Sequence, residues 1–244
     1  MEVHAHTHTP RKKWTHYFWE FLMLFLAVFC GFLAEYQLEH KIERDREKKF
    51  IQTFIEDLKT DTVAIRENIA FRQNKMKAMD TLTFLLNSQQ IKGYENDLYY
   101  LGRSFVRGVR FQSNDRTITQ LKNSGALRLI RNEKAADSMI SYQKLVEYIY
   151  YNQEDDRIER READPLLSHI FYPVVFDKMV TSEGINRPTD NPPLRSYDKN
   201  LHLDLAYYVH QLKGSNFMII GRLKMLNEKA KSMITFLEKE YHLK

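Results

Sequence analysis

The feature that most constrains this chain is an apolar run near its N-terminus. Residues 17–34 read YFWEFLMLFLAVFCGFLA, which is 18 residues with a single charge. As a helix this run extends about 27 Å, close to the thickness of the hydrocarbon layer of a bilayer. Aromatic rings, which favour the headgroup layer, stand near its two ends: Trp14, Tyr17, Trp19 and Tyr36. The sequence therefore predicts a transmembrane helix over residues 17–35 rather than a buried core helix, with the lipid bilayer as its partner.

A cleavable signal peptide is the main alternative for this segment. The basic residues 11–13 precede an apolar stretch over residues 21–34, as in the first two regions of such a peptide. The cleavage site fits poorly, because Phe32 stands where a small side chain is needed. A lipoprotein signal ending at Cys30 is disfavoured for the same reason by Phe29. We therefore expect the segment to remain attached as an anchor.

The distribution of basic residues predicts the orientation of the anchor. Arg11, Lys12 and Lys13 lie close to the apolar run and have no acidic neighbours, which favours a cytoplasmic tail over residues 1–16. Residues 41–49 carry more lysines and arginines but mix them with acids. We expect the N-terminus to be cytoplasmic and the soluble domain to lie on the other side of the membrane.

Two features inside the span go beyond anchoring. Glu20 is an ionisable group about one turn inside the membrane boundary, a position that is often functional, although Lys13 or His16 could neutralise it. Ala27, Gly31 and Ala34 are small residues spaced four and three apart, so they open one face of the helix to close approach. This face predicts a homo-oligomer or association with other membrane proteins.

The rest of the chain has the pattern of an all-α protein. After Pro10 the next proline is Pro165, and the chain has only 8 Gly. Residues 36–92 are predicted to continue the transmembrane helix as one long helix, because apolar residues recur there at alternating spacings of four and three. The stripe consists of Ile51, Ile55, Leu58, Thr62, Ile65, Ile69, Arg72, Met76, Met79, Thr83 and Leu86. Thr62 and Arg72 weaken it as a two-stranded coiled-coil seam, so we expect it to pack against later helices in a bundle.

Residues 93–244 are predicted to form the remainder of this soluble helical domain. The pattern indicates a short helix over 95–109, a helix over 117–121 capped by Ser113 or Asn114 and ended at Ser124-Gly125, and a helix that begins after Asn132. The charged stretch 154–162 is interpreted as the exposed end of that helix, with local ion pairs, rather than as a cation site of Glu154, Asp155 and Asp156. The last helix runs from 201 to 241, with a break possible at Gly214-Ser215. Between them, residues 181–200 lose all periodicity and are predicted to be a long loop, a candidate binding loop or lid.

Composition and motifs argue against several classes of function. The net charge of +5 comes from basic residues that alternate with acids, which is typical of solvated helix faces and does not predict a nucleic-acid partner. The single Cys30 excludes an intramolecular disulfide. No phosphate-binding glycine loop, metalloprotease, dithiol or nucleophile-elbow motif is present, so we expect no enzyme and no cofactor. His4, His6 and His8 could ligate a transition metal, but a polar tail explains them better, and we predict no metal site.

Five arginines near helix ends carry the one hypothesis about a ligand. They flank the segment where one predicted helix ends and another begins, and free backbone N–H groups there could join guanidinium groups around a carboxylate or phosphate. They are Arg103, Arg107, Arg110, Arg128 and Arg131. The hypothesis requires Arg107 and Arg128 to lie on the same side of the fold.

Two segments carry a resemblance to a known family. The stretch HTHTPRKKWTHYFWEFLMLFLAVFCGFLAE with REKKFIQTFIEDLKTD, and the later TITQLKNSGALRLIRN (117–132), resemble stretches of a family of single-pass membrane proteins of Bacteroidota, a domain of unknown function. The resemblance implies a bacterial inner-membrane location and a helical soluble domain, and it brings no catalytic residues.

These observations predict a membrane-anchored, non-enzymatic helical module. It would act through protein partners or as an extracytoplasmic sensor or scaffold. The alternatives are a protein that binds a small anion, through the arginines or the loop 181–200, and an accessory subunit of a membrane transport complex that uses Glu20.

Overall fold

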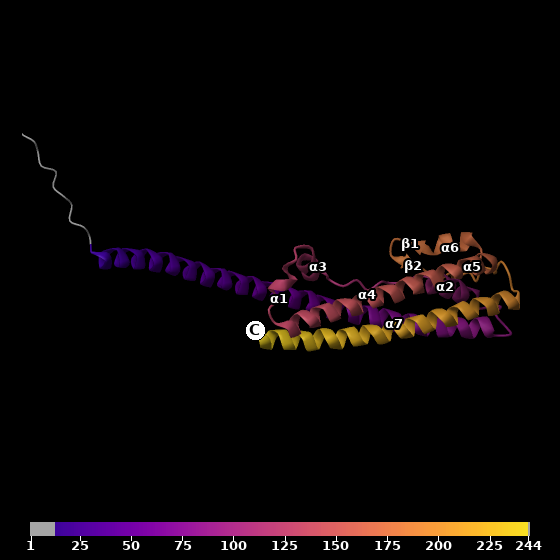
Figure 1. Ribbon diagram of the computed structural model, residues 1–244. Helices are drawn as coiled ribbons and strands as arrows, with labels where there is room; N and C mark the ends of the chain where they lie inside the picture. Colours follow the sequence, from indigo (N-terminus) through magenta and orange to yellow (C-terminus); the bar gives the residue numbers. More distant parts are fainter. Residues whose placement is uncertain (1–12, 244) are drawn as a thin grey trace, which may run out of the picture. The chain divides into compact units, whose positions relative to one another are not determined.

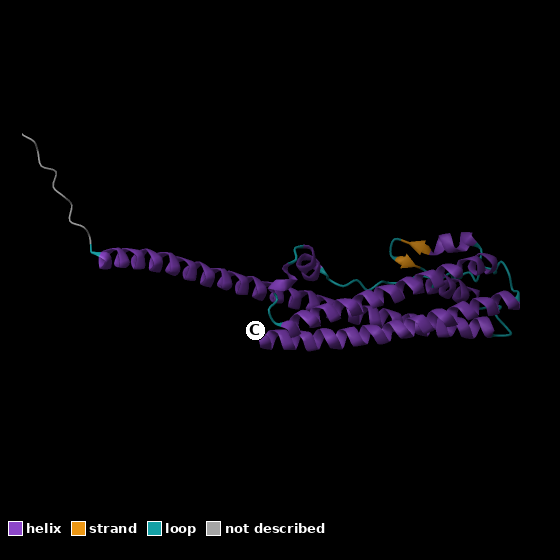
Figure 2. Ribbon diagram, in the orientation of Figure 1, coloured by secondary structure: helices purple, strands orange, loops and turns teal. Residues whose placement is uncertain are grey.

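The computed structural model describes residues 13–243, and the chain divides into two units between Lys49 and Phe50. The two units are described separately. In chain order the elements are α1 (Trp14–Asn87), α2 (Glu95–Phe105), α3 (Arg116–Asn123), η1 (Ala126–Leu129), α4 (Glu133–Glu162), α5 (Asp164–Ile170), α6 (Pro173–Met179), β1 (Val180–Thr181), β2 (Gly184–Ile185) and α7 (Lys199–Glu240). The predicted all-α fold is confirmed, since the described strands form only one two-residue antiparallel hairpin (Figure 2).

The N-terminal unit consists, in its described part, of the first turns of α1. Its apolar side chains are exposed, as lipid-facing side chains are expected to be: Phe21, Leu24, Phe25, Val28 and Phe32 are examples. Among the described residues, α1 is the one helix long and apolar enough to cross a membrane. The tail residues His4, His6, His8, Arg11 and Lys12 lie outside the described residues.

The second unit is a bundle of three long helices that lie side by side: α1 from residue 50 on, α4 and α7 (Figure 1). Helix α7 is antiparallel to α1, because Lys59 Nζ lies 2.8 Å from Glu238 Oε1 near the C-terminus of α7, whereas Lys199 Nζ at its N-terminus donates to the carbonyl of Leu86 at 3.0 Å. The long helix thus packs against later helices of the same chain, as expected from its weak seam.

The core of the bundle has two parts, and the predicted stripe of α1 contributes to both. One part joins α1 to the first half of α4 and the second half of α7, and includes Ile51, Leu58 and Ile65. The other joins the C-terminal end of α1 to α2, α5, α6 and the first half of α7, and includes Met79 and Leu86. The stripe contributes to both parts because residues spaced four and three apart lie on one side of a helix along its whole length, and that side packs against the neighbouring helices.

Two buried carboxylates of α1 fix the segment before α3. Asp57 Oδ2 accepts a hydrogen bond from the backbone N–H of Thr117 at 2.9 Å, and Asp61 accepts from Ser113 Oγ and from the N–H of Asn114. The sequence suggested Ser113 or Asn114 as the cap of α3, and this prediction is wrong. Asp57 of α1 accepts the hydrogen bond from the N–H of Thr117 in the first turn of α3 instead. The contact also joins the two stretches that carry the family resemblance.

Several helix boundaries differ from expectation by a few residues. Helix α1 ends at Asn87 and α2 at Phe105, both earlier than predicted, whereas α7 passes Gly214 without a break. The cap at Asn132 is confirmed, because its side chain accepts from the N–H of Ala135 at 3.1 Å. Gly125 adopts a left-handed conformation, φ 66°, after α3, as expected for a glycine that ends a helix.

The segment predicted as a loop over 181–200 begins with the β1–β2 hairpin and then packs on α2. Asn191 and Asn96 exchange hydrogen bonds between backbone N–H and side-chain oxygen, at 2.9 and 3.1 Å. Tyr99 donates to the carbonyl of Pro193 at 2.9 Å, and Leu194 is buried. These contacts attach the segment to the end of the bundle.

A candidate anion site in an arginine-rich cleft

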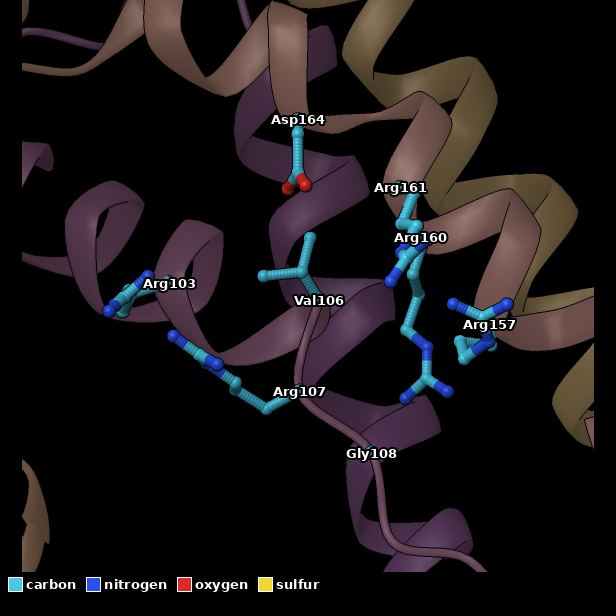
Figure 3. Close-up of a pocket in the computed structure, with 8 residues that line it drawn as sticks. All are labelled: Arg103, Val106, Arg107, Gly108, Arg157, Arg160, Arg161 and Asp164. Atoms are coloured by element: carbon cyan, nitrogen blue, oxygen red, sulfur yellow. The ribbon is translucent and has the colours of Figure 1, made fainter. Parts of the chain in front are cut away.

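A cleft of about 410 Å³ opens where the end of α2 approaches the ends of α4 and α5 (Figure 3). One wall is the last turn of α2 with residues 106–108, and the other is the last two turns of α4 with the start of α5. We call it the arginine cleft, and its lining residues are Arg103, Val106, Arg107, Gly108, Arg157, Arg160, Arg161 and Asp164. Both walls contribute guanidinium groups. Arg103 and Arg107, four residues apart, belong to one wall. Arg157, Arg160 and Arg161, which share a face of α4, belong to the other.

Two of these arginines are held by carboxylates of α4. Arg157 Nε donates to Glu154 Oε1 at 2.7 Å, and Arg160 Nη2 lies 2.8 Å from Asp156 Oδ2. Asp156 is almost fully buried, so its charge is compensated mainly by Arg160. These pairs anchor one wall of the cleft, in which the guanidinium of Arg160 lies next to Gly108 (Figure 3).

The other three arginines have no such partner. In the part of the chain that the structure describes, Arg103, Arg107 and Arg161 form no ion pair with any carboxylate. Burial, with a further contribution from Arg107, lowers the pKa of the Arg103 guanidinium, and its Nε is buried without a hydrogen-bond partner. The cleft thus concentrates uncompensated positive charge, with Asp164 as the one acid in its lining.

A polar layer beneath the cleft fixes the wall formed by residues 107–109. Arg72 is buried and donates to Asn216 Oδ1 at 2.8 Å and to the carbonyl of Val109 at 3.3 Å, while Lys75 donates to the carbonyl of Arg107. Burial, and secondly the charge of Arg160, lower the pKa of Lys75 to about 7. These contacts hold the backbone of residues 107–109, which forms part of one wall of the cleft.

Gly108 allows the two walls to approach. A Cβ atom at this position would lie 1.5 Å from Nη1 of Arg160, so no other residue fits without moving that guanidinium. Because Arg160 is itself fixed by Asp156, glycine is required here for close contact rather than for an unusual backbone angle.

This arrangement is suited to binding a multivalent anion. Guanidinium groups donate in planar forks that match carboxylate and phosphate oxygens, and several unpaired forks around one cleft favour more than one negative charge. A volume of about 410 Å³ fits a small metabolite. Asp164 can accept a hydrogen bond, which favours a ligand with a hydroxyl or amine near its anionic group.

The structure divides the five arginines that the sequence placed in one site. Arg103 and Arg107 line the cleft, whereas Arg110 pairs with Glu154 Oε2 at 2.9 Å and lines a neighbouring cavity of about 470 Å³. Arg128 lies in η1 and Arg131 just after it, both exposed, next to the other part of the core. The predicted single site is therefore wrong, because α3 and η1 are held at the opposite end of the bundle from α2 (Figure 1).

The sequence interpretation missed the three arginines of α4. Residues 154–162 were expected to be exposed, yet Asp156 is buried and Arg160 nearly so, with 11% of its side chain exposed. A signal was present, since Arg160 and Arg161 follow Arg157 by three and four residues, spacings that put each of them on the same helix face as Arg157. Among residues 13–243, no cluster of three or more histidine, cysteine or acidic side chains could hold a metal ion.

The N-terminal unit contains Glu20 and the small residues Ala27, Gly31 and Ala34. Glu20 Oε1 lies 3.0 Å from Nε2 of His16, one of the two partners considered for it. Ala27, Gly31 and Ala34 are exposed, and a Cβ atom on Gly31 would meet nothing within 4 Å. Their association face remains a prediction.

Comparisons with known proteins add no family to these observations. No protein-family model, no curated protein and no solved structure matches this chain. The resemblance to the Bacteroidota membrane family therefore remains an expectation from the sequence.

Proposed function

We propose that this protein is a membrane-anchored helical binding module whose soluble bundle binds a small multivalent anion in the arginine cleft. The observation that carries the proposal is the gathering of Arg103, Arg107 and Arg161 around one cavity, with no ion pair to any of them from residues 13–243. Unpaired like charges repel one another, and a bound anion relieves that repulsion. Of the two uses expected for the soluble domain, this geometry favours ligand binding over a purely scaffolding role.

The chemistry of the cleft supports binding rather than catalysis. Its lining consists of arginines with Val106, Gly108 and Asp164, and it contains no nucleophile paired with a base. The single apolar helix near the N-terminus supports a single membrane span. A bacterial inner membrane, with a cytoplasmic N-terminus and the bundle on the other side, completes the proposal.

The test is equilibrium binding of sulfate and phosphate to the full chain in detergent, by calorimetry and by the shift of the melting temperature. Arg107→Gln and Arg161→Gln should each weaken binding by about tenfold or more, since a hydrogen bond to a charged group contributes about 1.5–3 kcal/mol. Both side chains are exposed and make no ion pair, so the fold should tolerate these changes.

Arg128→Gln is the matched control, because it removes the same charge from an exposed position outside the cleft. It should leave the affinity unchanged. Equal losses in all three variants would show attraction by net charge alone and contradict a specific site, as would the lack of saturable binding to the unmodified chain.

A further inference from the structure

A second cavity lies next to the arginine cleft, along the same stretch of chain. The segment 106–115 joins α2 to α3 and runs along α4, where Gln153 accepts a hydrogen bond from the N–H of Phe111 at 2.7 Å and donates to its carbonyl at 3.1 Å (Figure 2). The arginine cleft opens between the start of this segment and the end of α4. The second cavity, of about 470 Å³, opens between the rest of the segment and the preceding turns of α4. The two cavities are therefore successive parts of one groove.

Three side chains that pair with one another form the boundary between the two cavities. Glu154 Oε1 accepts a hydrogen bond from Arg157 Nε at 2.7 Å, and Glu154 Oε2 lies 2.9 Å from Arg110 Nη2. Arg157 lines the arginine cleft, whereas Arg110 and Glu154 line the second cavity. Since Glu154 and Arg157 are three residues apart, about 4.5 Å along the helix axis, one small molecule can contact both cavities.

The second cavity contains a carboxylate that the described part of the chain leaves free. Asp115 lines the cavity and directly precedes α3, a position where an aspartate often caps a helix, but its side chain accepts no capping hydrogen bond. Among residues 13–243 this carboxylate also has no ion-pair partner. Glu154, the other acid of the lining, is already paired with two arginines. The cavity therefore offers a carboxylate acceptor, in contrast to the guanidinium donors of the arginine cleft.

Tyr150 adds a donor and an aromatic ring beside this acceptor. Its hydroxyl oxygen accepts a hydrogen bond from the N–H of Ser113 at 2.8 Å. Burial raises the pKa of the Tyr150 phenol, the N–H of Ser113 opposes this, and the charge of Asp115 adds to it. The phenol therefore keeps its proton at neutral pH and can donate it to a ligand. Hydroxyl groups, which both donate and accept, match a cavity that offers this donor together with the Asp115 acceptor.

We propose that the groove binds a phosphate monoester of a hydroxyl-rich compound, a sugar phosphate, with the phosphate in the arginine cleft and the hydroxyl groups in the second cavity. The inference rests on the proposed anion binding and adds the chemical class of the ligand. Guanidinium forks of the cleft bind the phosphate oxygens, while Asp115 accepts hydrogen bonds from sugar hydroxyl groups and Tyr150 donates to them. The opposite character of the two cavities fixes the direction in which the ligand lies.

Calorimetry on the full chain in detergent tests this inference with two phosphate monoesters, methyl phosphate and glucose-6-phosphate. Both carry the same anionic group, and only the second carries a hydroxylated ring. Glucose-6-phosphate should bind at least about tenfold more tightly, because a hydrogen bond to a charged acceptor is one of the strong kinds. Equal affinities, or no binding of either ester where sulfate binds, would overturn this inference and leave the proposed anion site intact. If neither sulfate nor either ester bound, that site would be contradicted as well.

Asp115→Ala tests whether the added affinity comes from the second cavity. It should lower the ratio of the two ester affinities by about fivefold or more, since the free acceptor is lost, and the ratio cancels the general effect of removing a negative charge. Asp155→Ala is the matched control, because Asp155 lines neither cavity and has no ion-pair partner among the described residues. It should leave the ratio unchanged. A ratio that Asp115→Ala also left unchanged would refute the second cavity as the site of the sugar.

Discussion

The two ends of the bundle differ in how their charged and polar side chains are satisfied. At the end near α3 a buried acid is hydrogen-bonded within the chain, whereas at the end near α2 arginines line a cleft without ion pairs from the described residues. At one end, Asp61 accepts hydrogen bonds from Ser113, from the N–H of Asn114 and from Tyr142, so this buried carboxyl group is satisfied within the fold. At the other end, Arg103 and Arg107 form no ion pair with a carboxylate of the described part of the chain. A charge that is satisfied within the chain is structural, whereas a cluster left unsatisfied favours a ligand that the chain does not supply.

The largest expected effect is at the satisfied end, where Asp61→Ala removes the shared acceptor. Ser113 Oγ and Tyr142 OH would then be buried donors without partners. We expect a loss of about 3–5 kcal/mol in the free energy of unfolding, because a broken buried network costs far more than a surface contact. Urea denaturation followed by circular dichroism measures it. Asp137→Ala, at an exposed position without an ion pair, is the control, and an equal effect there would contradict the structural role of Asp61.

The second effect concerns the close approach of the two walls at the cleft. Gly108→Ala puts a Cβ atom 1.5 Å from Nη1 of Arg160 and so moves that guanidinium from buried Asp156. We expect a loss of about 1–3 kcal/mol in unfolding free energy and weaker sulfate binding. Gly31→Ala, where nothing lies within 4 Å, should leave the unfolding of the bundle unchanged. If Gly108→Ala changed neither the unfolding free energy nor sulfate binding, the requirement for glycine next to Arg160 would be contradicted.

If the arginine cleft binds an anion as proposed, we expect Lys75 to make that binding depend on pH. Burial and Arg160 lower its pKa to about 7, while Asp156 opposes this and Arg72 adds to it. An anion near Arg160 offsets the repulsion and raises the pKa, so binding takes up a proton and strengthens as pH falls through about 7. Sulfate, which does not titrate in this range, should bind about tenfold more weakly at about pH 8 than at about pH 6. Lys75→Met should abolish the dependence; an identical dependence in that variant would assign it to another group.

The sequence predicted the bundle better than the site, for a physical reason. Helical stripes such as Ile51, Ile55 and Leu58 depend only on local periodicity, and the core contains them as expected. Arg103 and Arg107 could be singled out in the same way, from their spacing. Whether a guanidinium meets a carboxylate depends on helices far apart in the sequence, so the local composition around Arg160 could not reveal the cleft.

The smallest expected effect is that of Arg103→Met. We expect this variant to raise the stability of the ligand-free protein but to lower its affinity for sulfate. The buried Nε of Arg103 lacks a hydrogen bond, and burial and Arg107 lower the pKa of the group, so its charge is held at a cost. Its guanidinium lies 5.4 Å from the ring of Phe176, a contact that contributes about 0.5–1 kcal/mol and is lost in the variant. Because an unsatisfied buried donor costs about 1–3 kcal/mol, we expect methionine to stabilise the ligand-free protein by about 1 kcal/mol or less.

The same variant should bind sulfate about tenfold more weakly, since one unpaired guanidinium has left the cleft. Arg160→Met is the contrasting variant: it removes the partner of buried Asp156, so it should lower both stability and affinity. Denaturation without ligand and calorimetry with sulfate separate the two cases. If Arg103→Met destabilised the ligand-free protein as much as Arg160→Met, Arg103 would be structural, and the difference between the two ends of the bundle would disappear.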